Sequence, residues 1–120
     1  MQTFPYDIEY YENDAGKRPF KQWLQGLTDV SGRAKIRIRL DRARLGNLGD
    51  HKTVGAGVWE MRIDYGPGYR IYFGKERERI LLLLIGCDKS MQNRDIEQAQ
   101  GYWQEHLRRK GHGTTDKLSG

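Results

Sequence analysis

Apolar positions along the first half of the chain change their period, and each change predicts an element of secondary structure. Alternation of apolar and polar residues predicts a strand over residues 6–11. Helical spacing predicts a helix over residues 18–27 and a second helix from an N-cap at Ser31 to about Leu45. The residues expected to form the buried stripe of the second helix are Ala34, Ile36, Ile38, Leu40, Ala43 and Leu45.

The second half of the chain is dominated by strand-like patterns. A short strand is predicted near residues 52–54, and residues 59–64 and 69–73 alternate on either side of a Gly-Pro-Gly turn, which predicts a hairpin. The unbroken apolar run within residues 79–87 is typical of a central strand covered on both faces. A last helix is predicted over residues 93–109. Its expected inner face comprises Ile96, Ala99, Tyr102, Trp103 and Leu107.

This order of elements predicts a small α+β domain in which the helices pack on one face of a largely antiparallel sheet. The other face is then expected to be open for binding. Side chains alternate across a strand, so Arg62, Arg70 and Tyr72 are expected to meet on that open face. Two adjacent guanidinium groups repel each other unless an anion lies between them, and phosphate oxygens match the planar fork of arginine. The hairpin therefore predicts a phosphate-binding site.

Composition narrows the class of protein. The chain has 120 residues, a net charge of +5 and an isoelectric point near 9.4, so a polyanionic partner is plausible. A single domain is expected over residues 1–110, and a polar tail over residues 111–120 is expected to be disordered. No apolar run approaches the length of a membrane span, and one cysteine suits a reducing compartment. We therefore expect a cytoplasmic protein with no membrane contact, no bound metal and no cofactor.

Three ordered stretches carry a resemblance to a known family: residues 46–58, the hairpin, and residues 86–96. The chain resembles the RelE/ParE toxin superfamily, and within it the HigB-like branch of addiction-module killer proteins. The resemblance implies a small curved, mainly antiparallel sheet with two helices before it and one after it. It also implies the toxin of a type II toxin–antitoxin pair, held silent by a cognate antitoxin protein that is often of the helix-turn-helix type.

Two activities occur in this superfamily, and fold alone does not separate them. RelE- and HigB-like members are mRNA interferases, endoribonucleases that cleave mRNA in the ribosomal A site and so inhibit translation, with the ribosome and mRNA as partners. ParE-like members inhibit DNA gyrase instead. A non-catalytic member that only binds its antitoxin and co-represses the operon is a third alternative, and a homo-oligomer is compatible with the sequence.

Metal-independent RNA cleavage uses the ribose 2′-hydroxyl as the nucleophile. The protein must then orient the backbone, move two protons and neutralise the charge of the transition state. Arg62 and Arg70 suit the neutralisation, and the resemblance implies that Lys52 and Lys89 flank the same face and take part in phosphate binding and proton transfer. Tyr72 is expected to stack on a base.

Other interpretations of these residues remain open from the sequence. Some HigB-like relatives place histidine and aspartate in the site, which makes His51 and Asp88 secondary candidates. Arg62 can instead form an ion pair with Glu60 or Asp64, its neighbours on the same side of the strand.

The second helix is strongly basic. Several of its cations lie four residues apart and repel one another, which favours a polyanionic partner such as ribosomal RNA. A solubilising face and an antitoxin-binding surface are the alternatives. The residues expected to bind RNA here are Arg33, Lys35, Arg37, Arg39, Arg42 and Arg44.

Overall fold

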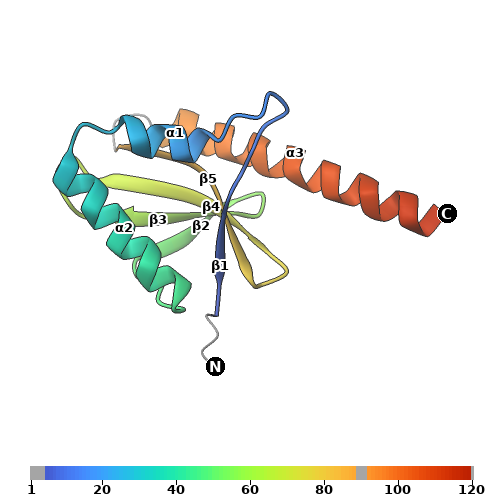
Figure 1. Cartoon of the computed structure of the whole chain (residues 1–120), viewed down its shortest axis with the longest axis horizontal. Coiled ribbons are helices and arrows are strands. Elements are labelled where there is room, and N and C mark those ends of the chain that lie inside the picture. Colours follow the sequence, from blue (N-terminus) through green and yellow to red (C-terminus); the bar gives the residue numbers. More distant parts are fainter. Residues whose placement is uncertain (1–4, 89–91, 120) are drawn as a thin grey trace.

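A computed structural model of the chain describes residues 5–88 and 92–119, with side-chain surroundings described for residues 5–88 and 93–110. It has α+β architecture, with three helices and five strands in the predicted order (Figure 1). In chain order the elements are β1 (Asp7–Tyr10), α1 (Pro19–Gly26), α2 (Val30–Arg44), β2 (His51–Gly55), β3 (Val58–Ile63), β4 (Tyr69–Glu76), β5 (Ile80–Asp88) and α3 (Gln92–Ser119).

The five strands form one sheet with the order β1-β5-β4-β3-β2. Three of the four strand pairs are antiparallel, and β1 alone runs parallel to its neighbour β5. The predicted mainly antiparallel sheet is therefore confirmed. The apolar strand β5 is internal to the sheet, as expected from its continuous run of leucines.

Helices cover both faces of the sheet, so the expectation of one open face is wrong. Helices α1 and α2 pack on one face, and α3 crosses the other (Figure 1). Leu81 and Leu83 of β5 belong to the core under α1 and α2, whereas Leu82 and Leu84 belong to the core under α3. The second core arises because α3 carries its own apolar face, with Ala99 and Trp103 buried against the strands. Ala99 and Trp103 thus match the inner face predicted for this helix, whereas Leu107 is exposed.

Helix α2 begins and packs differently from the prediction. Its N-cap is Asp29 rather than Ser31, and the Asp29 carboxylate accepts a hydrogen bond of 2.9 Å from the backbone N–H of Gly32. The same carboxylate accepts a hydrogen bond of 2.6 Å from the Tyr69 hydroxyl, which ties the start of α2 to β4. The buried residues of this helix are Gly32, Ile36, Leu40 and Ala43.

The C-terminal helix is longer than the sequence pattern indicated. Helix α3 continues to Ser119, beyond the predicted end near Arg109, and extends past the sheet (Figure 1). The division into a domain and a disordered tail stays a prediction. Among the described residues, no helix combines the length and apolar character needed to cross a membrane.

Two glycines of the sheet each contact a tryptophan of a helix, one tryptophan on each face of the sheet. A Cβ atom placed on Gly86 of β5 would lie 2.3 Å from the Trp23 ring of α1, and one placed on Gly74 of β4 would lie 2.3 Å from the Trp103 ring of α3. Rigid indole rings cannot fold away from such a contact as a flexible chain end can. The absence of a side chain at these two positions therefore allows α1 and α3 to pack closely on the sheet.

Gly86→Ala is expected to lower the free energy of unfolding by about 1–3 kcal/mol, because the added methyl group overpacks the contact with Trp23. Gly101→Ala is the matched control, because no other side chain or strand among the described residues lies within 4 Å of the Cβ position and alanine is the better helix former. Urea denaturation of both variants measures the difference. Equal stability of the two variants would show that the glycine at position 86 is not required by packing.

Candidate functional site

Strand register brings the predicted site residues of the hairpin together on the sheet face that α3 crosses. Lys52, Glu60 and Tyr72 pair across β2, β3 and β4 to form one row. Arg62 and Arg70 pair directly in the neighbouring row. Paired residues project to the same side of a sheet, and so do residues two apart on one strand. The prediction that Arg62, Arg70 and Tyr72 share a face is confirmed.

The anion between the two arginines is Glu60. Its carboxylate is fully buried and accepts a hydrogen bond of 2.8 Å from Arg62 Nε. It also accepts a hydrogen bond of 3.0 Å from the Tyr72 hydroxyl and lies 3.7 Å from Arg70 Nη1. The alternative in which Arg62 pairs with Glu60 is thus confirmed. Sequence reasoning named Glu60 only as a possible ion-pair partner of Arg62, and its position two residues from Arg62 on the same side of the strand was the available signal.

Glu60 is held as a carboxylate. Burial by itself raises its pKa, but the hydrogen bonds from Arg62 and Tyr72 and the charges of Arg70 and Arg62 outweigh burial and bring the pKa below its ordinary value of 4.5. The single negative charge of Glu60 therefore faces the positive charges of two arginines, Arg62 and Arg70. Lys52 adds a further positive charge in the row next to these arginines. We call Lys52, Glu60, Arg62 and Arg70 the cationic sheet site.

Exposure divides this site into an accessible part and a supporting part. The Arg62 side chain is 40% exposed, and neither of its Nη groups has a hydrogen-bond partner among the described residues. Lys52 is exposed as well. Arg70 is only 8% exposed, and its Nη1 lacks a hydrogen-bond partner in the described part of the chain. An incoming anion can therefore reach Arg62 and Lys52, with Arg70 behind them.

Tyr72 does not lie on an open surface, which corrects the prediction that it stacks on a base. Its ring is fully buried in the core beneath α3, and its hydroxyl donates to Glu60. Burial and the nearby Cys87 and Glu60 raise the pKa of Tyr72, so the phenol stays protonated. In this arrangement Tyr72 orients Glu60. The correction follows from the position of α3, which the period of β4 does not reveal.

The neighbouring Cys87 thiol is buried and forms no disulfide. Burial, together with a hydrogen bond to Asp95, raises the pKa of Cys87 to about 12. Cys87 pairs with Arg70 in the sheet register and packs in the core under α3.

The two secondary candidates, His51 and Asp88, lie on the other side of the sheet. His51 pairs with Met61, whose side chain lies in the core under α1 and α2, and the His51 Nδ1 atom is 2.8 Å from the Gly49 carbonyl oxygen. Asp88 pairs with Tyr69, which belongs to the same core. The structure therefore does not bring His51 or Asp88 into the cationic sheet site. Lys89 lies outside the described residues.

One basic residue of α2 has a structural role that the sequence did not indicate. Arg39 donates hydrogen bonds of 2.7 Å to the Arg62 carbonyl oxygen and 2.9 Å to the Leu48 carbonyl oxygen. Burial lowers its pKa, although the charge of Asp50 opposes that effect. Arg39 thus ties α2 to the strand that carries Arg62, and its guanidinium is not free to bind RNA as predicted. The other basic residues predicted to bind RNA, Arg33, Lys35, Arg37, Arg42 and Arg44, lie at least partly exposed.

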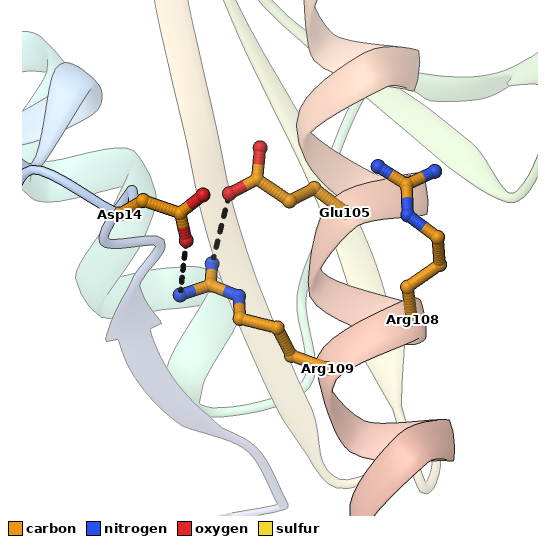
Figure 2. A pocket seen from close by; sticks show the side chains of 4 residues that line it. All are labelled: Asp14, Glu105, Arg108 and Arg109. Carbon is orange, nitrogen blue, oxygen red and sulfur yellow. Dashed lines mark ion pairs between the residues drawn. The ribbon is translucent and has the colours of Figure 1, made fainter.

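A shallow hollow between α3 and the segment after β1 is lined by two acidic and two basic side chains, those of Asp14, Glu105, Arg108 and Arg109 (Figure 2). Arg109 reaches across it to Asp14 and also pairs with Glu105, both at 3.6 Å. Its Nη2 donates a hydrogen bond of 2.8 Å to the Glu12 carbonyl oxygen. These contacts tie α3 to the N-terminal part of the chain, and the acidic and basic side chains balance each other.

The lowered pKa of Glu60 predicts a specific acid sensitivity. The carboxylate stabilises the native state fully above its unfolded-state pKa, and this stabilisation is lost as the pH falls through the lower folded-state pKa. The free energy of unfolding of the wild type should therefore drop as the pH falls below about 4.5 and on through the lower folded-state pKa. Glu60→Gln should lack this part of the drop in urea denaturation curves. Parallel pH profiles for the two proteins would contradict the assignment.

No family model matches the chain. An uncharacterized protein of Haemophilus influenzae is 44% identical to it over 86 residues, which cover 72% of this chain and 87% of the relative. This similarity extends over most of both proteins. The chain therefore belongs to the same protein family as this Haemophilus influenzae protein.

Proposed function

We propose that the protein is the toxin of a type II toxin–antitoxin system and acts as a ribosome-dependent mRNA endonuclease. The observation that carries this proposal is the cationic sheet site, in which Arg62 and Lys52 are accessible while the buried Glu60 holds Arg62 in place. The proposal also rests on the resemblance of residues 46–58, the hairpin and residues 86–96 to HigB-like members of the RelE/ParE superfamily.

The proposed chemistry needs no nucleophile from the protein. The ribose 2′-oxygen attacks the adjacent phosphorus, the 5′-oxygen leaves, and the products carry a 2′,3′-cyclic phosphate and a 5′-hydroxyl. The Nη groups of Arg62 bind the phosphate oxygens and stabilise the extra charge of the phosphorane. Arg70 adds positive potential from behind. Lys52 is the accessible group that exchanges protons with the reacting oxygens.

The proposal includes a RelE-like arrangement of the sheet, a cytoplasmic location and a cognate antitoxin. Such an antitoxin silences the toxin until it is removed. Supporting the RelE-like arrangement are two helices ahead of the meander and one after it.

Induction of the protein without an antitoxin tests this function. Primer extension on abundant transcripts should reveal new 5′ ends within translated codons, and these ends should disappear when initiation of translation is blocked. Intact mRNA together with a DNA damage response would favour a gyrase inhibitor. Normal growth with folded protein present would favour a non-catalytic co-repressor. Either result would exclude the proposed endonuclease.

A further inference from the structure

Helix α2 has a second apolar side that faces away from the sheet. Its buried residues follow one line of the helix, and a separate line of apolar residues recurs at spacings of four, four and seven. Val30 is 67% exposed, Ile38 45% and Leu45 56%. The outward stripe, as we call it, comprises Val30, Ala34, Ile38 and Leu45.

Basic side chains flank the outward stripe on both sides. Helical spacing places Arg33, Arg37 and Arg44 along one flank and Lys35 and Arg42 along the other. Asp41 is the one acidic residue of this helix and lies within the stripe. The surface of α2 is therefore an apolar strip bordered by two cationic rows, about the length of a 15-residue helix.

A hollow borders the stripe on each side of α2. One lies beside Ile38 and is also lined by Arg42, Ile63 and Tyr65, and Lys35 lies 5.6 Å from the centre of the Tyr65 ring. The other lies where α2 meets α1 and β1, and its lining includes Arg37 and Arg44. A ridge with a groove on each side matches the surface that another helix packs against. Helix α2 lies at the outside of the fold, away from α3 (Figure 1).

We propose that the outward face of α2 binds an acidic amphipathic helix of another protein. The apolar side of such a helix covers Val30 and Ile38, and its flanking carboxylates pair with Arg37 and Arg42. A second copy of this chain fits poorly, because a symmetric contact would bring the cationic rows of the two α2 helices together. RNA phosphates would use the cations but gain nothing from three large exposed apolar side chains at the centre of the surface.

This inference is independent of the proposed nuclease activity, because none of the stripe residues belongs to the cationic sheet site. The probe is a fluorescent helical peptide as long as α2, with leucines along one side and glutamates beside them. A peptide with lysine in place of each glutamate and a single-stranded RNA oligonucleotide are the comparison probes. The variant Val30→Ser/Ile38→Ser removes apolar contact at exposed positions, and Arg37→Ala/Arg42→Ala removes charge.

The acidic peptide should bind the wild type at least about tenfold more tightly than the lysine peptide does, and each double variant should weaken its binding by about tenfold. Unchanged thermal unfolding of the Val30→Ser/Ile38→Ser variant would confirm that the loss of binding is local. Equal binding of the two peptides would overturn the proposal. The proposal would also be overturned if the RNA oligonucleotide bound more tightly than the acidic peptide and if only the Arg37→Ala/Arg42→Ala variant weakened binding of the RNA.

Discussion

Arg62→Ala is expected to lower the rate of mRNA cleavage by about 100-fold or more, which corresponds to the loss of one positioned group that stabilises transition-state charge. We expect this effect because Arg62 is the accessible guanidinium of the cationic sheet site. Its Nε bonds to Glu60, and neither Nη group has a hydrogen-bond partner in the described part of the chain, so both can bind phosphate. Expression of the variant without an antitoxin should also permit normal growth. The rate is measured by single-turnover cleavage on ribosomes that carry a defined mRNA.

Two controls separate catalysis from charge and from folding. Arg79→Ala removes a guanidinium that is largely exposed and pairs with Asp7 at 3.7 Å, so it should leave the cleavage rate unchanged. Arg62→Lys keeps the charge but loses the planar guanidinium that can bond to Glu60 and to the phosphate at the same time. Its cleavage rate should therefore also be strongly lowered. Wild-type cleavage by Arg62→Ala would refute the assignment of Arg62 to the active site.

Glu60→Ala is expected to lower the free energy of unfolding by about 3–5 kcal/mol, the range observed when one partner of a buried ion pair is removed. Arg70 is 8% exposed and would keep its charge with Glu60 gone, and the Tyr72 hydroxyl would lose its acceptor within the core. Arg62 can turn toward water and contributes less to this loss. Urea denaturation at neutral pH measures the effect.

The double variant Glu60→Leu/Arg70→Met tests whether the loss comes from the unpaired charge of Arg70. Replacing both charges by apolar groups should recover most of the stability lost in Glu60→Ala, because no buried charge then lacks a partner. A double variant as unstable as Glu60→Ala would show that the cost arises from packing and not from the guanidinium.

The hairpin and the central strand could be predicted from the sequence because their signals are local. Gly66 and Gly68 have positive φ angles of 57° and 85°, which the Gly-Pro-Gly turn requires. Alternation on each side of this turn then sets the register, so Arg62 and Arg70 pair as expected. The strand β5 could be predicted because an unbroken run of apolar residues is also a local signal, and it indicated a strand covered on both faces.

The misplaced residues depend on how elements pack, which local patterns do not record. Ile36 and Ile38 are the same residue type, yet Ile36 is buried against the sheet and Ile38 faces outward. The helix α2 carries two lines of apolar residues at helical spacing, and the sequence does not show which line packs on the sheet. Tyr72 is buried because α3 returns over the sheet from the far end of the chain. Once Tyr72 is covered, Glu60 is enclosed beside it, and the arginine pair becomes a network around one carboxylate.

The central claim is that the cationic sheet site cleaves mRNA on the ribosome. The most direct measurement incubates the purified protein with ribosomes programmed with a defined, end-labelled mRNA and maps the 3′ ends of the products. We expect a cut within the A-site codon that leaves a 2′,3′-cyclic phosphate, that requires the ribosome and that persists in the presence of a metal chelator. Intact mRNA with the folded wild-type protein, or equal cleavage by Arg62→Ala, would contradict this account.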